Sequence, residues 1–238
     1  MRNPQRFWLT PGYVLHQHAY RDTSRIVEVF TREQGRLSLF ARGARSPKSA
    51  LRATLRPFQP LLISWTGRSE AGQLTAAEIA GDFAQLPAGR LMSGFYLNEL
   101  LLKLTERFDP HPGVFDEYGE ALRVLGGDAN PEPPLRRFEK RLLEELGYGT
   151  DFTLTDRGEA VEPGARYRVQ PQRPVIRCEP SLPEAVSGSS LIELARESFE
   201  NEQSLRDAKR ILRAAIEACL DGRTLGSRTI MKSLQGRN

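Results

Sequence analysis

The stretch SRIVEVFTREQGRLSLFA, residues 24–41, decides the fold of the first part of the chain. Residues 25–30 are rich in β-branched side chains, as strands are. Residues 36–41 alternate between two kinds of side chain, which is typical of a strand with one buried face. The polar segment 31–35 between the two runs is short and ends in glycine. The pattern therefore predicts a β-hairpin.

The second run of this hairpin has two distinct faces. Leu37 and Leu39 share one face, and Arg36, Ser38 and Phe40 share the other. Because successive side chains of a strand point to opposite sides of a sheet, we expect the leucines to face a core. The opposite face then carries one cation, one hydroxyl group and one aromatic ring.

Three further apolar runs, residues 7–15, 60–66 and 73–79, extend the β pattern on both sides of the hairpin. A long basic connection punctuated by prolines, GARSPKSALRATLRPFQP at residues 43–60, lies between the third strand and the fourth. Five short strands within about eighty residues predict a small barrel, and an OB-like barrel is our first choice. An SH3-like barrel is the alternative that the pattern leaves open.

From residue 88 the hydrophobic period changes to that of amphipathic helices. The expected helices cover residues 91–104, 114–125, 135–146, 191–199, 205–219 and 229–234. Between the third and fourth of these helices the helical period is lost, with short β-like pieces at 166–169 and 175–178. The sequence predicts an α+β chain of two domains. They are an N-terminal OB-fold β-barrel over residues 1–82 and a mostly α-helical domain over 83–238, with a loop-rich insert at 148–187.

The composition of the 238 residues is that of an ordinary globular protein, with 39% hydrophobic, 27% charged and 8% aromatic residues. This balance excludes an intrinsically disordered chain. The two cysteines, Cys178 and Cys219, cannot form a disulfide framework, and they fit a reducing compartment. No apolar run has the length of about 18 residues that a membrane helix needs. We therefore expect a cytoplasmic protein without a membrane partner.

The net charge of +4 is distributed unevenly along the chain. Residues 1–80 carry 12 Lys and Arg against 5 Asp and Glu, residues 81–203 carry 14 against 22, and residues 204–238 carry 8 against 3. The basic excess is densest between residues 36 and 56, where there is no acidic residue. Such a local excess attracts a polyanion, and arginine matches the geometry of phosphate groups. An ordinary solvated surface is the alternative interpretation.

Aromatic residues accompany this basic stretch, as in proteins that bind single-stranded nucleic acid. Phe58 and Trp65 are expected in the barrel core. Phe40 lies on the face opposite the leucines and is the better candidate for stacking on a base. The predicted nucleic-acid-binding residues are Arg36, Phe40, Arg42, Arg45, Lys48, Arg52 and Arg56.

Two more basic clusters fall on predicted helices. Arg206, Lys209, Arg210 and Arg213 share one side of a helix whose other side is apolar. Near the start of an earlier helix lie Arg136, Arg137, Lys140 and Arg141. These clusters can contact nucleic acid, bind the carboxylates of an acidic peptide, or form solvated helix faces paired with neighbouring glutamates.

The sequence contains no recognisable catalytic motif, neither a P-loop nor GxSxG. His16 and His18 share a strand face, but no cysteine or acidic pair completes a metal site. We therefore expect no catalytic residue, no metal and no cofactor. A Mg²⁺-dependent nuclease is the enzymatic alternative, which the absence of acidic residues beside the basic stretch disfavours.

Four segments carry a resemblance to a known family, and they lie in the family's order between Gly12 and Arg228. They are SRIVEVFTREQGRLSLFARGARSPKSALRATLRPFQPLLISWTG, GFYLNELLLKL, PPLRRFEKRLLEELGYG and SLRDAKRILRAAI. The sequence resembles the RecO family of bacterial recombination mediators over nearly its whole length.

This resemblance implies an OB fold followed by a helical domain. It implies binding of single- and double-stranded DNA and annealing of complementary strands. It also implies that the protein, together with RecR, helps to load RecA on DNA coated by the single-stranded DNA-binding protein. The alternatives are an RNA-binding OB-fold protein and an adaptor without annealing activity.

Members of this family dock the acidic C-terminal tail of the single-stranded DNA-binding protein on the helical domain. The matching motifs here imply this role for Arg136, Arg206, Lys209 and Arg210, and the same clusters add Arg137 and Arg213. Some relatives hold zinc with four cysteines after the GYG motif. Here only Cys178 lies between that motif and the next predicted helix, so we expect no zinc.

Overall fold

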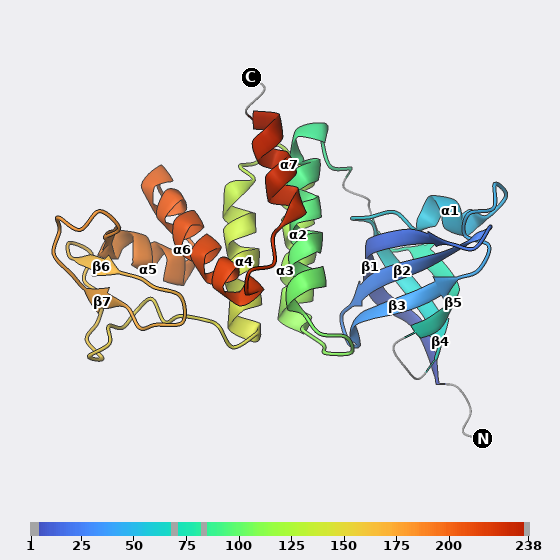
Figure 1. Ribbon diagram of the computed structural model, residues 1–238, viewed down its shortest axis with the longest axis horizontal. Coiled ribbons are helices and arrows are strands. Elements are labelled where there is room, and N and C mark those ends of the chain that lie inside the picture. The colour runs from blue at the N-terminus through green and yellow to red at the C-terminus, as the bar shows by residue number, and fades with distance from the viewer. Residues whose placement is uncertain (1–4, 68–70, 82–84, 236–238) are drawn as a thin grey trace. The chain divides into compact units, whose positions relative to one another are not determined.

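The structure, a computed structural model, describes residues 5–67, 71–81 and 85–235 (Figure 1). The chain forms two compact units. Unit 1 contains Met1–Ala129 and Leu225–Asn238, and unit 2 contains Asn130–Thr224. Unit 2 is therefore inserted in the chain of unit 1. The predicted division of the chain between residues 82 and 83 stays a prediction.

Unit 1 begins with a closed five-stranded barrel in which the strands follow the order β1-β2-β3-β5-β4. The strands are β1 (Arg6–Tyr20), β2 (Ser24–Thr31), β3 (Gly35–Ala41), β4 (Pro60–Thr66) and β5 (Ala71–Ile79). β3 and β5 pair in parallel, and the other neighbours are antiparallel. This arrangement is that of the five-stranded OB barrel, which is the first of the two predicted alternatives. It confirms the predicted α+β fold.

The register of the hairpin explains which side chains fill the barrel. Val27 lies opposite Leu39 and Val29 lies opposite Leu37, and all four side chains are buried in the barrel core. Trp65 is also part of this core, as expected. β1 extends to Tyr20, beyond the predicted end at residue 15. Its pairing with each neighbouring strand shifts register once, which interrupts the alternation of side chains although the backbone pairing continues.

The β2–β3 turn approaches the connection after α2 (Leu91–Leu104) very closely. Gly35 has a φ of +67°, and a Cβ atom there would overlap the carbonyl oxygen of Asp109. The amide of Phe108 donates to the carbonyl oxygen of Arg36 at 3.0 Å, which holds the two segments together. A side chain at position 35 must therefore push the connection away or strain the turn.

We expect Gly35→Ala to lower the free energy of unfolding by about 2–4 kcal/mol, from the left-handed backbone and the overlap together. Urea denaturation measures this effect. Gly43→Ala is the matched control, because Gly43 has a similar φ of +69° but nothing within 4 Å of the added atom. The control isolates the backbone cost of about 1 kcal/mol. Equal losses in the two variants would contradict the close approach.

The helical part of unit 1 comprises the 3₁₀ turn η1 (Ala88–Arg90), α2, α3 (Pro112–Gly126) and α7 (Gly226–Gln235). The buried side chain of Asn98 on α2 joins it to the barrel, because its amide donates to the carbonyl oxygen of Leu15 at 2.8 Å. The hydroxyl of Tyr118 on α3 donates to the Asn98 oxygen at 2.6 Å. Both the donor and the acceptor of this buried amide are therefore satisfied.

α7 docks on α2 through one carboxylate. Glu99 accepts hydrogen bonds from the amides of Gly226 and Ser227, both at 2.9 Å, and from the Ser227 hydroxyl at 2.6 Å. A carboxylate at a helix N-terminus satisfies amides that lack partners within the helix. Partial burial works against the charged form, but these hydrogen bonds and Lys103 outweigh it, so the pKa of Glu99 lies below its ordinary value.

The lowered pKa makes the docking of α7 sensitive to acid. Its contribution to stability is complete above the ordinary pKa of a glutamate and is lost as the pH falls through the lower pKa of the folded state. We expect hydrogen exchange of the α7 amides, corrected for its intrinsic pH dependence, to become faster in this acidic range. Glu99→Gln is expected to remove the pH dependence and to speed exchange at neutral pH. A variant that exchanges like the wild type would contradict this role.

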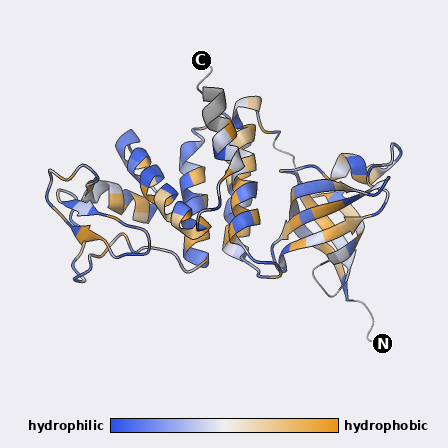
Figure 2. Cartoon of the chain, viewed as in Figure 1, coloured by the Kyte–Doolittle hydropathy of each residue, from blue (hydrophilic) through white to orange (hydrophobic). Residues whose placement is uncertain are grey.

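Unit 2 is built on three helices, α4 (Glu132–Glu145), α5 (Gly188–Arg196) and α6 (Glu202–Leu220). α6 packs against both α4 and α5. Ser187 and Asn201 cap α5 and α6 with their side chains. Figure 2 shows both polar and apolar residues on α2, α3, α4 and α6. The helical period in the sequence predicted these elements because one side of each helix is apolar.

The segment between α4 and α5 contains a small three-stranded sheet of order β7-β6-β8. β6 (Arg166–Arg168) and β7 (Ile176–Arg177) fall within the two predicted β pieces, whereas β8 (Val186–Ser187) was not predicted. The helix α1 (Ala50–Thr54), in the connection between β3 and β4, is too short to show a helical period. No helix in the described part of the chain has the length and apolar character to cross a membrane.

Candidate nucleic-acid interface

Five exposed cations follow the third barrel strand, and we call them the basic arc: Arg42, Arg45, Lys48, Arg52 and Arg56. One of them, Arg52, lies on the helix α1. Leu51 of this helix packs against the barrel core, and Leu55, which follows the helix, is buried in that core. The two leucines hold this segment on the barrel, and Arg52 and Arg56 beside them are exposed.

Within residues 5–67, 71–81 and 85–235, the basic arc has no acidic neighbour to neutralise it. Among the residues that the structure describes, no carboxylate lies within 4.0 Å of its cationic groups. Uncompensated charges on one surface attract counterions, and a polyanion that displaces those counterions gains binding free energy. The five exposed cations predicted for phosphate binding are thus available to a ligand.

The basic arc continues into the loop between β1 and β2. Arg45 donates from its guanidinium to the carbonyl oxygen of Arg21 at 3.1 Å, and its own amide donates to the carbonyl oxygen of Thr23 at 2.8 Å. In OB folds this loop and the face of the second and third strands contact nucleic acid. The contact fixes the loop beside the arc.

An aromatic pair lies where this loop meets the barrel. The rings of Tyr20 and Phe40 are 5.5 Å apart and nearly perpendicular, at 87°. The guanidinium of Arg21 lies 5.4 Å from the centre of the Tyr20 ring, at a distance typical of a cation–π contact. Sequence reasoning identified Phe40 but missed Tyr20. The feature of the sequence that could have indicated Tyr20 is its position as an aromatic residue directly before the charged residues Arg21 and Asp22.

The aromatic pair borders an open pocket of about 480 Å³ on the outer face of β2 and β3. Its lining includes Tyr20, Arg21, Ile26, Ser38, Phe40 and Arg107. Ile26 and Phe40 lie opposite each other in the antiparallel register, so their side chains share the outer face. We call this hollow the aromatic pocket.

Arg36 does not belong to the basic arc. Its guanidinium donates to Glu28 at 3.4 Å and to the carbonyl oxygen of Thr105 at 2.8 Å. Glu28 also accepts from Ser38, and from Arg107 at 2.8 Å. Burial lowers the pKa of Arg36 in spite of the Glu28 charge. The Arg36 guanidinium is thus engaged in hydrogen bonds within unit 1. Its predicted contact with nucleic acid stays a prediction.

In unit 2, Arg136 is also turned inward. Its guanidinium donates to Glu139 at 2.9 Å, and the two side chains are only 4% and 2% exposed. The neighbouring side chain of Arg137 is half-buried. The predicted contact of these two arginines with an acidic tail stays a prediction, and the structure does not place Arg136 at the surface.

The four cations predicted on α6 are closer to the surface. Arg206 and Arg210 are exposed but have partners on their own helix, Glu202 at 3.1 Å and Asp207 at 3.6 Å. Lys209 contacts Glu132 of α4 at 2.8 Å. The Arg206–Glu202 pair is exposed on both sides, and ion pairs of this kind are weak.

Arg213 is exposed and forms no ion pair within the described part of the chain. The two predicted clusters therefore come together where α4 packs on α6, with Arg213 open and Arg136 buried. Their role in binding an acidic tail stays a prediction.

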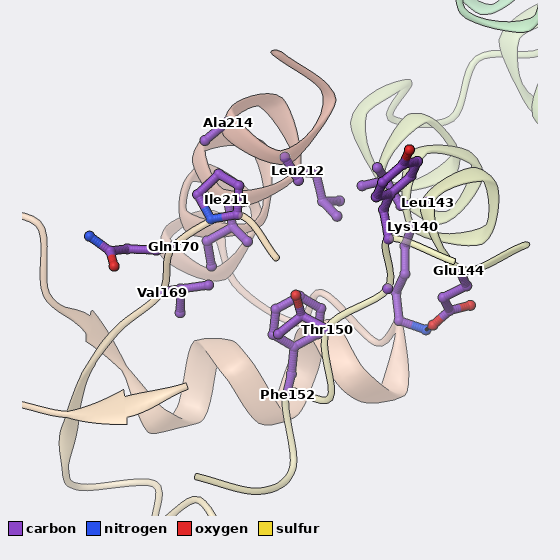
Figure 3. Close-up of a pocket in the computed structure, with 14 residues that line it drawn as sticks. Lys140, Leu143, Glu144, Thr150, Phe152, Val169, Gln170, Ile211, Leu212 and Ala214 are labelled. Atoms are coloured by element: carbon purple, nitrogen blue, oxygen red, sulfur yellow. Dashed lines mark ion pairs between the residues drawn. The ribbon is translucent and has the colours of Figure 1, made fainter. Parts of the chain in front are cut away.

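Beside these cations, α4, α6 and the segment after α4 enclose an apolar pocket (Figure 3). Leu143 and Leu212 come from the two helices, and Phe152 closes the pocket from the following segment. Lys140 lies at its edge and contacts Glu144 and Glu197, both at 2.8 Å. Burial works against its charge, but these two carboxylates outweigh it and raise the pKa of Lys140.

No metal site is apparent in the described residues, where no three His, Cys, Asp or Glu side chains come together in a way that could hold an ion. Cys178 and Cys219 are both free thiols. The segment after the GYG motif is held instead by the small sheet and by hydrogen bonds. One of these is the bond from the Glu162 amide to the hydroxyl of the buried Tyr167, at 2.8 Å.

Comparison with known proteins covers nearly the whole chain. Residues 3–83 match the family described as "Recombination protein O N terminal", and residues 88–229 match "Recombination protein O C terminal". A protein named DNA repair protein RecO from Thiobacillus denitrificans is 45% identical over 239 residues, which cover 95% of this chain and 92% of the relative.

Two further relatives carry the same name. The one from Aromatoleum aromaticum is 42% identical, with 99% of each chain covered. The one from Cupriavidus metallidurans is 42% identical, with 94% of this chain and 76% of the relative covered. The chain belongs to the RecO family of DNA repair proteins.

Proposed function

We propose that this protein binds single- and double-stranded DNA on the barrel and anneals complementary strands. We further propose that, with RecR, it helps to load RecA on DNA coated by the single-stranded DNA-binding protein. The observation that carries the proposal is the basic arc, five exposed cations with no acidic neighbour among the described residues, together with an aromatic pair of the exposed Tyr20 and the half-buried Phe40. This combination suits single-stranded nucleic acid. The protein acts as a mediator rather than an enzyme, in the cytoplasm.

The basic arc supports annealing through electrostatics. Two DNA strands repel each other, and cations that neutralise their phosphates lower this repulsion while both strands are bound. Base pairing then supplies the free energy, so the reaction requires no nucleotide hydrolysis.

Docking of the acidic tail of the single-stranded DNA-binding protein is the second part of the proposal. The cations of α6 and the apolar pocket between α4 and α6 lie in the same unit. A tail that combines carboxylates with an apolar residue would find partners for both at such a surface. This supports an assignment to unit 2 rather than to the barrel.

An annealing assay tests the whole proposal. Two complementary oligonucleotides are coated with the single-stranded DNA-binding protein, and duplex formation is followed by fluorescence with and without this protein. We expect acceleration, and we expect it to disappear when the acidic tail of the coating protein is deleted.

Binding to bare DNA without acceleration would reduce the function to that of a general nucleic-acid binder. Tighter binding to matched RNA than to DNA would favour the RNA-binding alternative. Cleavage of the labelled DNA in the presence of Mg²⁺ would contradict the non-enzymatic role.

A further inference from the structure

We infer that the aromatic pocket takes one unpaired base of single-stranded DNA, so that the barrel distinguishes a single strand from a duplex. The inference rests on the proposed function, because it requires DNA on the basic arc. It adds a specific site for a base and a reason why the affinity changes when the strand becomes paired.

The geometry of the aromatic pair suits a planar ligand. Tyr20 is 38% exposed, and the ring of Phe40 stands nearly perpendicular to the Tyr20 ring. A base stacked on one ring would meet the edge or the face of the other, and both arrangements are favourable between π systems. Ile26 adds an apolar wall, and the volume of about 480 Å³ is ample for one base.

Polar groups line the other side of the aromatic pocket. Glu28 accepts a hydrogen bond from Arg107 at 2.8 Å and thereby fixes the direction of its guanidinium. The Arg107 side chain remains 38% exposed, so it keeps donors for a ligand. Exocyclic oxygens and ring nitrogens of bases accept hydrogen bonds from arginine.

The aromatic pocket and the basic arc are physically continuous. Arg45 of the arc holds the backbone of Arg21 and Thr23, in the loop that follows Tyr20. The charged groups for the phosphates and the rings for the base are therefore joined through the loop between β1 and β2. A single DNA strand whose phosphates contact the basic arc would therefore have a base close to the aromatic pocket.

A base inside a duplex cannot use this pocket. Its faces are covered by neighbouring base pairs, and exposing one requires unstacking and unpairing. The pocket therefore adds affinity to a single strand and none to a duplex. When two bound strands pair, this contact is lost, which favours release of the product after annealing.

Binding of two oligonucleotides of the same length tests the inference. One is an ordinary oligo(dT), and the other contains only abasic residues, so it keeps the phosphates without the bases. We expect the wild type to bind the first about 5- to 150-fold more tightly, the range for stacking of one base on an aromatic side chain. In the double variant Tyr20→Ala, Phe40→Ala this ratio should fall towards 1.

The salt dependence and the affinity for a duplex should be unchanged in this double variant, because the basic arc is intact. Phe108→Ala is the control, since Phe108 is an exposed aromatic residue outside the aromatic pocket. Phe40→Leu, which keeps an apolar side chain, guards against a loss of folding and should lower the ratio in part.

An undiminished ratio in the double variant would overturn the inference, as would an equal loss of affinity for the abasic strand. Failure of the proposed function appears differently. In that case variants of the basic arc would bind DNA as the wild type does, whatever the pocket variants show.

Discussion

Replacing all five cations of the basic arc by alanine is expected to weaken binding to single-stranded DNA by about 10³-fold at 0.1 M salt. Each phosphate contact contributes about 0.7 to the slope of log K against log salt, so losing five contacts flattens the slope by about 3.5. The affinities of wild type and variant should converge near 1 M salt, where the counterion contribution vanishes. Fluorescence anisotropy of a labelled oligonucleotide over a salt series measures both values.

A control variant with the same loss of charge separates local contacts from the net charge of the protein. It replaces five exposed arginines outside the barrel and outside the two helical clusters by alanine: Arg123, Arg157, Arg173, Arg177 and Arg196. We expect its slope to stay close to that of the wild type. If the two variants flatten the slope equally, the arc is not the DNA site, and long-range attraction accounts for binding.

Arg136→Ala is expected to lower the free energy of unfolding of unit 2 by about 3–5 kcal/mol, the range for breaking a buried ion pair on one side. The Glu139 carboxylate, 2% exposed, would lose the guanidinium that faces it at 2.9 Å. Urea denaturation followed by a probe in unit 2 measures the loss.

Two comparison variants make this result interpretable. Replacing both partners, as in Arg136→Met with Glu139→Leu, should recover much of the stability because no buried charge remains. Arg206→Ala should change stability little, since Arg206 and Glu202 are exposed. A small loss in Arg136→Ala would show that the pair opens to solvent. Because Arg136→Ala destabilises unit 2, a loss of tail binding in this variant indicates a lost contact only if the variant is shown to be folded.

The barrel was predictable from sequence because its signals are local. Alternation at positions 36–41 places Leu37 and Leu39 inside, and the structure confirms it. The glycine at position 35 marks the turn that joins β2 and β3. The helices followed from their hydrophobic period for the same reason. A helix of five residues spans too little sequence to produce a period, so α1 was not predicted. β7 and β8 have two residues each, but β7 directly follows the apolar Val175, whereas β8 has Val186 as its one apolar residue and was not predicted.

The candidate site was predictable only in part. An exposed cation and a buried one have the same sequence signal, and only tertiary contacts separate Arg42 on the surface from Arg136 in its ion pair. Tyr20 at the end of β1 meets Phe40 on β3 because both strands pair with β2, so the two rings meet across β2. Nothing within five residues of either ring indicates this neighbour.

The return of α7 to α2 has a consequence for synthesis on the ribosome. Residues 105–225, which include all of unit 2, emerge between the two helices. At a translation rate of about 5–20 residues per second this interval is about 6–24 s. During that time the barrel can close, but the Glu99 carboxylate and the apolar surface of α2 that α7 covers remain exposed. The nascent chain therefore passes through a stage in which this surface is open to chaperones or to aggregation, and it ends only when α7 arrives.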